Sequence, residues 1–207
     1  MQKEVIILGA GGHAKVIADA ILKRGDEVLG FLDDNDEVQG KEIYLGRKVI
    51  GKTSEVMNYQ DKNFVIGIGS NKVRKMFVEK YNNLKWYTAI HPSAIIAQDV
   101  VIGEGTVIMP GTIINPGTVV GKHCIINTSV SLDHDNMIGD YVHISPGSHL
   151  AGTVTVGDST WICAGVTIIN NITIGNNDVI GAGATVIKNI EKNDSTFIGV
   201  PAKILIK

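Results

Sequence analysis

The stretch VIGEGT VIMPGT IINPGT VVGKHC (Val101–Cys124) decides the fold, because its pattern repeats every six residues. The second residue of each hexad is aliphatic, and the repeat runs in phase from Ala89 to Ile190. A fixed short repeat is typical of a solenoid, in which each unit packs only on its neighbours. A β-sandwich instead alternates with period two and varies its loop lengths, so the repeat argues against one.

A longer period of eighteen residues, or three hexads, lies over the first. It is marked by glycines at the third place of every third hexad: Gly103, Gly121, Gly139, Gly157 and Gly175. We read this as a triangular coil of three short strands joined by three corners, with the second-place aliphatic side chains stacked inside. The glycines are expected at one corner, in a backbone conformation with positive φ that other residues resist.

The length leaves room for one large domain or two small ones, and the start of the repeat divides the chain into residues 1–88 and residues 89–207. The chain has 207 residues and a net charge of −2, which gives no reason to expect nucleic acid or an anionic membrane surface. No signal peptide or membrane span is visible. The two cysteines, Cys124 and Cys163, lie inside the repeat and favour buried thiols in a reducing cytoplasm.

The N-terminal part has the pattern of a Rossmann-like α/β domain. The apolar run VIILGA is expected to form a strand, followed by a helix over AKVIADAILKRG that stops at Gly25. Further strands are expected at Val28–Leu32 and Phe64–Ile68, and a charged helix after them runs to Asn82. Parallel strands alternating with helices bind ligands at the carboxyl ends of the strands.

A glycine-rich loop follows the first strand, with Gly9, Gly11 and Gly12 ahead of His13. Small residues there let backbone N–H groups at a helix N-terminus approach a phosphate. An NAD site would also require an acidic residue after the second strand, and Asp33 or Asp34 could be that residue. A domain of 88 residues has no room for the second half of a dinucleotide fold, so a mononucleotide or nucleotide-sugar fits better.

The stretch SLDHDN (Ser131–Asn136) is the most suggestive for catalysis. His134 stands away from the inward place, and an acid on either side of it, Asp133 or Asp135, could accept a bond from its ring. Such a bond fixes the tautomer and raises the basicity of the imidazole, as a general base requires. His143 lies nine residues on, half a coil away, so the two histidines are expected to meet only between subunits.

The whole chain resembles the NeuD/PglD-like sugar O/N-acetyltransferases, a family of hexapeptide-repeat enzymes. The motifs that carry the resemblance are IILGAGGHAKVI, GFLDDN, DHDNMIGDYVHISPGSHLAGTVTVGD and GVPAKIL. The resemblance implies an α/β N-terminal Rossmann-like domain followed by a left-handed parallel β-helix. It also implies a homotrimer that holds acetyl-coenzyme A between adjacent β-helices, with no metal.

Site roles follow from the same resemblance. His134 would be the general base and Asp135 its orienting acid, where many relatives have Glu. His143 would contact the acetyl-coenzyme A thioester, and the backbone N–H of Gly152 would stabilise the oxyanion. A nucleotide-sugar would be held by residues of the N-terminal domain: Gly9, Gly11, Gly12, His13, Asp33 and Asp34. Relatives often have Cys where this chain has Asn136, a difference that we expect to affect packing.

The expected reaction is direct acetyl transfer from acetyl-coenzyme A to the 4-amino group of a nucleotide-linked amino-deoxysugar, with UDP as the first choice. O-acetylation of sialic acid or a related glycan precursor is the alternative on the same scaffold. A γ-carbonic-anhydrase-like zinc protein would use His143 and His149, which are six residues apart and expected on one face. A non-catalytic nucleotide-binding scaffold is the remaining reading.

Overall fold

The computed structural model describes residues 2–206 and divides the chain into two compact units. The first unit ends at Pro92 and the second begins at Ser93, against a sequence-based division after residue 88. The first is an α/β unit and the second is a β-solenoid, and each is described by itself.

The first unit is built on one six-stranded sheet with the order β3-β4-β2-β1-β5-β6. All neighbours are parallel except β3 and β4, which form an antiparallel hairpin. Its elements are β1 (Glu4–Leu8), α1 (Gly12–Lys23), β2 (Glu27–Leu32), η1 (Asp36–Val38), β3 (Glu42–Tyr44), β4 (Arg47–Gly51), η2 (Thr53–Tyr59), β5 (Asn63–Ile66), α2 (Asn71–Lys80), β6 (Lys85–Trp86) and β7 (Ala89–Ile90). The predicted strands and helices are thus confirmed, whereas β3, β4 and β6 were not foreseen.

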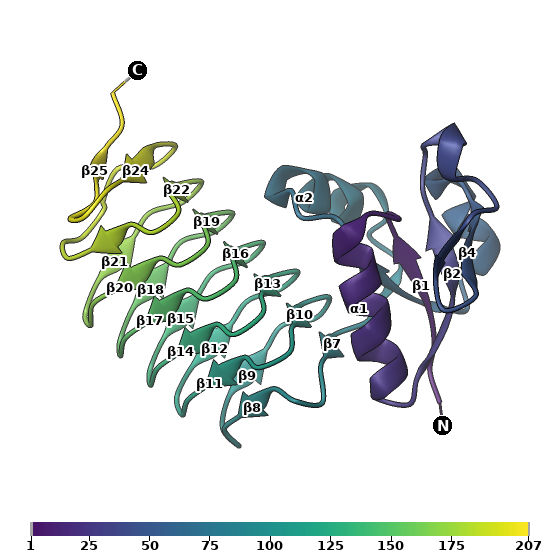
Figure 1. Ribbon diagram of the computed structural model, residues 1–207, viewed down its shortest axis with the longest axis horizontal. Coiled ribbons are helices and arrows are strands. Elements are labelled where there is room, and N and C mark those ends of the chain that lie inside the picture. The colour runs from purple at the N-terminus through teal and green to yellow at the C-terminus, as the bar shows by residue number, and fades with distance from the viewer. Residues whose placement is uncertain (1, 207) are drawn as a thin grey trace. The chain divides into compact units, whose positions relative to one another are not determined.

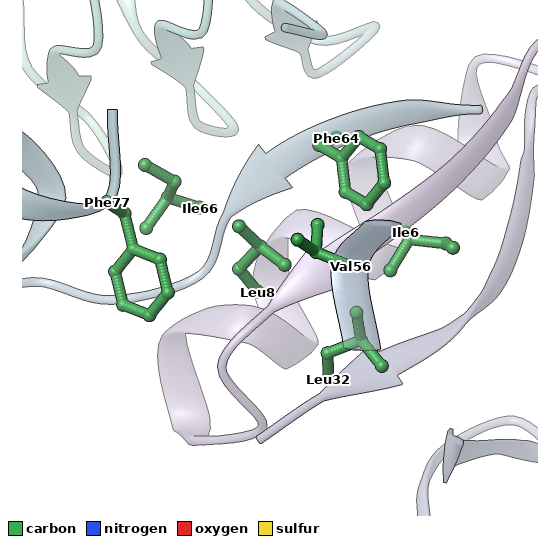
Figure 2. Close-up of a cluster of buried hydrophobic side chains, with 7 residues drawn as sticks. All are labelled: Ile6, Leu8, Leu32, Val56, Phe64, Ile66 and Phe77. Atoms are coloured by element: carbon green, nitrogen blue, oxygen red, sulfur yellow. The ribbon is translucent and has the colours of Figure 1, made fainter. Parts of the chain in front are cut away.

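The core of this unit forms where the apolar strands meet the elements that follow them. Seven buried side chains make one cluster, shown in Figure 2: Ile6, Leu8, Leu32, Val56, Phe64, Ile66 and Phe77. They come from β1, β2, η2, β5 and α2. Burial of this apolar surface is the main contribution to the stability of the sheet, and it holds in place the edge at which the parallel strands end.

The second unit winds through two-residue strands, one per hexad, and adds a terminal hairpin. The strands are β8 (Ile95–Ile96), β9 (Val101–Ile102), β10 (Val107–Ile108), β11 (Ile113–Ile114), β12 (Val119–Val120), β13 (Ile125–Ile126), β14 (Ser131–Leu132), β15 (Met137–Ile138), β16 (His143–Ile144), β17 (His149–Leu150), β18 (Thr155–Val156), β19 (Trp161–Ile162), β20 (Thr167–Ile168), β21 (Thr173–Ile174), β22 (Val179–Ile180), β23 (Thr185–Val186), β24 (Thr196–Ile198) and β25 (Lys203–Ile204).

Three parallel sheets form the faces of this solenoid, and Figure 1 shows their strands stacked coil upon coil. Successive strands of one sheet are three hexads apart, as where Ile125 pairs with His143. The antiparallel hairpin of β24 and β25 closes the C-terminal end of one sheet. The eighteen-residue coil predicted from the sequence is therefore confirmed, and the unit is a left-handed β-helix.

The interior of the solenoid is filled from two places of each hexad. Every second-place aliphatic side chain from Ile108 to Val186 is buried, as predicted. The sixth place is buried as well, and it includes polar residues such as Thr106, Thr118 and Thr160. Their hydroxyls donate to backbone carbonyls of the next coil, as Thr118 does to Asp133 at 2.9 Å. A buried polar group is tolerated when it is bonded in this way.

The corners correct one expectation. The third-place glycines do not have positive φ; that conformation belongs to the fifth place of every hexad from Gly105 to Gly183. Side chains occur there too, as at Asp135 (φ 58°) and Thr153 (φ 60°). The third-place glycines are needed because the coils approach closely: a Cβ on Gly121 would lie 2.6 Å from the carbonyl oxygen of Gly139.

Among residues 2–206, no helix is long and apolar enough to cross a membrane.

Candidate functional site

His134 projects from the corner that follows β14, with 59% of its side chain exposed. The next residue, Asp135, occupies the left-handed fifth place, and this turn of the backbone brings its carboxylate back to the imidazole. The ring Nδ1 and Asp135 Oδ2 are 2.8 Å apart. With Nδ1–H donating to the carboxylate, the neutral ring presents Nε2 as a proton acceptor.

The two acids beside His134 accept hydrogen bonds from different groups. Asp135 binds the ring, and this hydrogen bond is the main reason that the pKa of His134 is raised. Asp133 Oδ1 instead accepts from the backbone N–H of His134 at 2.9 Å and from the amide of Asn115 at 3.0 Å. These bonds lower the pKa of Asp133, so it stays ionised and adds a smaller upward contribution to the pKa of His134.

Gly152 lies one coil beyond His134, against its ring. A Cβ at Gly152 would come within 2.5 Å of the imidazole Nε2, so only glycine leaves the ring where it is. Some fourth-place N–H groups donate to side chains, as that of His134 does to Asp133. Within the described part of the chain, no side chain accepts from the Gly152 N–H. A backbone donor is therefore available close to the ring nitrogen that would handle the proton.

Asn136 closes the turn that carries His134 and is fully buried. Its amide nitrogen donates to the carbonyl oxygen of Asp133 at 2.6 Å, and its amide oxygen accepts from the N–H of Val154 at 3.0 Å. The residue thus ties the turn to the following coil. The expected effect on packing is seen here as a hydrogen-bonding role that a Cys side chain could not fill in the same way.

His143 lies on β16, in a different sheet from β14. Its ring stacks on Trp161 with centroids 5.8 Å apart, and its Nε2 lies 3.3 Å from the amide nitrogen of Asn127. Within one chain His134 and His143 therefore stand on different sides of the solenoid, as the spacing predicts.

His149 corrects the expectation that it shares a face with His143. One hexad advances the chain by one face, so β17, which carries His149, belongs to another sheet than β16. The His149 Nδ1 lies 2.8 Å from Ser131 Oγ, on the neighbouring strand β14. Over residues 2–206, no group of three His, Cys, Asp or Glu side chains is arranged to hold a metal.

The glycine loop lies at the carboxyl edge of the first unit's sheet, where α1 begins. β1 stands between β2 and β5, so the order of the strands reverses beside it, which is the usual ligand position in such sheets. A Cβ on Gly9 would meet Ile68 Cγ1 at 2.6 Å. Among residues 2–206, no atom beyond the chain neighbours and the helix backbone lies within 4 Å of a Cβ built on Gly11 or Gly12. None of the described side chains caps the start of α1. Open space at an uncapped helix N-terminus fits a phosphate.

His13 is the first side chain of α1 beyond these glycines. Burial, and next the positive charge of Arg74, lower its pKa to about 4. At neutral pH His13 is therefore an uncharged donor or acceptor. Arg74 itself is 2% exposed and donates to the carbonyl of Gly69 at 2.8 Å and to Asn71 Oδ1 at 3.0 Å. It holds the loop that follows β5, and nothing in the sequence pattern of α2 marked it as buried.

Asp33 and Asp34 organise the loops of this edge. Asp33 accepts from the Ala10 N–H at 2.8 Å, which ties it to the glycine loop, and from the Asn35 N–H at 2.9 Å. Asp34 binds the hydroxyl and N–H of Thr53. The structure thus brings Gly9, Asp33 and the start of α1 together at one edge of the sheet. The Asp34 carboxylate instead accepts its hydrogen bonds from Thr53, at the start of η2.

Comparison with protein families gives two matches. Residues 4–81 match the PglD N-terminal domain, and residues 99–134 match the bacterial transferase hexapeptide (six repeats). UDP-N-acetylbacillosamine N-acetyltransferase of Bacillus subtilis (strain 168) is 43% identical over 108 residues, which cover 49% of each chain. The chain thus spans about half the length of this curated relative, and 20% of an uncharacterized mimivirus protein.

Solved structures match this chain almost end to end. The acetyltransferase domain of PglB from Neisseria gonorrhoeae FA1090 has 32% identity and a TM-score of 0.92, over 99% of this chain and 100% of that one. PerB from Caulobacter crescentus, in complex with CoA and GDP-perosamine, has 34% identity and a TM-score of 0.90, over 97% and 96% of the two chains. The chain therefore belongs to the NeuD/PglD-like family of hexapeptide-repeat sugar acetyltransferases.

Proposed function

We propose that this protein transfers the acetyl group of acetyl-coenzyme A to the 4-amino group of a nucleotide-linked amino-deoxysugar, with UDP as the nucleotide. One observation carries the proposal: an exposed imidazole has its Nδ1 fixed by Asp135 and its Nε2 beside Gly152. Relatives named for N-acetylation of UDP- and GDP-linked amino sugars support the same substrate class.

His134 acts as the general base in this proposal. Acetyl-coenzyme A supplies the acetyl thioester when bound. The sugar nitrogen attacks the thioester carbonyl, His134 Nε2 takes the proton that the nitrogen loses, and the carbon–sulfur bond breaks. Coenzyme A leaves as its thiolate, which takes up the proton from His134 to give the free thiol. Because Asp135 stabilises the protonated ring, it favours proton transfer to His134, and positioned acid–base assistance contributes about 10²–10⁴ in rate.

Gly152 and His143 are proposed to bind the thioester end of acetyl-coenzyme A. The Gly152 N–H has no side-chain acceptor among the described residues, and a preorganised donor of this kind stabilises a developing oxyanion. His143 stands on another face from His134, so it would serve the same site from a neighbouring subunit of a homotrimer. This arrangement would be contradicted if analytical ultracentrifugation showed a monomer under conditions in which the protein is fully active.

The N-terminal domain, residues 1–88, is proposed to hold the nucleotide-sugar. The support is the open space at Gly11 and Gly12, the uncapped start of α1 and the uncharged His13 beside it. Asp33 is proposed to act both on the loop and on the ligand, since a carboxylate oxygen can accept more than one bond. We expect the protein in the cytoplasm, where Cys124 and Cys163 stay reduced.

The test is release of free coenzyme A from acetyl-coenzyme A with UDP-, GDP- and dTDP-linked amino sugars and sialic acid as acceptors. We expect turnover with a UDP-linked 4-amino sugar and a His134→Ala variant slower by about 10²–10⁴-fold. The matched control is His149→Ala, which removes another exposed histidine of the solenoid. Release with sialic acid alone would establish O-acetylation instead, and near-parental turnover of the His134 variant would refute the base.

A further inference from the structure

The carboxylate that orients His134 rests on a residue of the preceding coil, Gly117. Gly117 and Asp135 occupy the fifth place of hexads one coil apart, and the Asp135 N–H donates to the carbonyl of Pro116 at 3.0 Å. A Cβ built on Gly117 would overlap Asp135 Oδ1, while the other oxygen, Oδ2, is the one that binds the His134 ring.

Backbone conformation alone does not require glycine at this place. Gly117 has a φ of +74°, but the same corner carries Asp135, Thr153 and Asn171 at φ values of 58°, 60° and 61°. Side chains are thus accepted at the fifth place in coils of this corner. What sets Gly117 apart is the carboxylate that lies over its Cα, since any Cβ there competes with Asp135 Oδ1 for space.

We infer that Gly117 is a positioning residue for the proposed base, because the space left by its missing side chain seats the Asp135 carboxylate in reach of His134. The inference rests on the proposed function for its catalytic consequence only. A methyl group at this position moves Oδ1, and because the two oxygens are rigidly joined, Oδ2 leaves Nδ1. The ring then loses the bond that fixes its tautomer.

The primary experiment measures the pKa of His134 by NMR titration of its imidazole in the parent, Gly117→Ala and Asp135→Ala. The charged groups that face this ring are Asp133 and Asp135, and the Asp135 bond contributes most to raising the pKa. We expect Gly117→Ala to lower the pKa of His134 toward its ordinary value of 6.5. The double variant Gly117→Ala/Asp135→Ala should have the same His134 pKa as Asp135→Ala alone.

The matched control is Gly183→Ala. Gly183 also has the fifth-place conformation, with φ +69°, but apart from its chain neighbours no atom of the described residues lies within 4 Å of a built Cβ. Both alanine variants therefore carry the same backbone strain, and only one disturbs Asp135. If Gly117→Ala does not fold, Gly117→Asn replaces it, because asparagine tolerates positive φ while still bringing a Cβ.

The second readout is acetyl transfer. We expect kcat/KM to fall about 10- to 100-fold in Gly117→Ala and to stay at the parental value in Gly183→Ala. A parental pKa of His134 in Gly117→Ala would overturn the inference, whatever the activity. A parent without any acetyl transfer would overturn the proposed function, yet the pKa comparison would still decide the role of Gly117.

Discussion

Gly152→Ala tests the contact that places the Gly152 backbone against the His134 ring. A Cβ at this position would lie 2.5 Å from both Nε2 and Cε1, and ordinary contact begins near 3.4 Å, so the ring must move by about 1 Å. Misplacement of a catalytic group by that distance costs up to about 100-fold in rate. The alanine keeps the backbone N–H, which separates the steric effect from loss of the donor.

The same substitution is expected to leave stability nearly unchanged. Gly152 does not have positive φ, so alanine suits its backbone, and the exposed ring is free to swing toward solvent. We expect a change in the free energy of unfolding within about 1 kcal/mol, measured by urea denaturation. A large fall in stability would show that the coil, and not the ring alone, resists the added methyl group.

The assay is coenzyme A release with a UDP-linked 4-amino sugar, in the parent, Gly152→Ala, His134→Ala and the double variant. We expect kcat/KM of Gly152→Ala to fall by about 30- to 100-fold and the double variant to match His134→Ala. Parental kcat/KM in Gly152→Ala would refute the reasoning. An equal loss in the presence and absence of His134 would show that Gly152 acts without the ring.

Three further predictions concern stability. Gly121→Ala, whose Cβ would strike the Gly139 backbone, should lower the free energy of unfolding by about 2–3 kcal/mol, against about 1 kcal/mol for Gly147→Ala, which has positive φ but open space. The unfolded chain protonates His13 below about pH 6.5 and the folded chain only below about 4, so about 3 kcal/mol of stability should be lost as the pH falls through this window. Urea unfolding at several pH values can measure this loss, which should be smaller in His13→Gln. Burial raises the pKa of Asp178, so its ionisation opposes folding as the pH rises, and Asp178→Asn should raise the melting temperature at pH 8 but not at pH 3.5.

Features that depend on spacing were predicted well from the sequence. The aliphatic second place fixed the coil, and once the coil was known, His134 had to lie outside it and His143 on another face. The pairing of His134 with an acid was also predicted, because a turn can bring the side chains of adjacent residues within hydrogen-bonding distance. The residue pattern alone left open which acid binds the ring; the family resemblance named Asp135, and the left-handed turn at Asp135 brings its carboxylate to the ring.

Features that depend on close approach in space were missed. Arg74 lies in a helix whose charged sequence suggests exposure, yet it is buried and its guanidinium donates to the carbonyl of Gly69. The third-place glycines were assigned positive φ because glycine usually signals it, whereas the structure needs them for contact between coils. Sequence alone does not distinguish these two uses of glycine.

The eighteen-residue coil has a consequence for how such a protein can change in length. The contacts around the His134 turn join residues one coil apart: Asn115 to Asp133, Gly117 to Asp135, and His134 to Gly152. Duplication or loss of a whole coil elsewhere would leave these neighbours in place, whereas a one-residue insertion between Asn115 and Gly152 would separate them. The solenoid can therefore gain or lose full coils of eighteen residues without changing the contacts around His134.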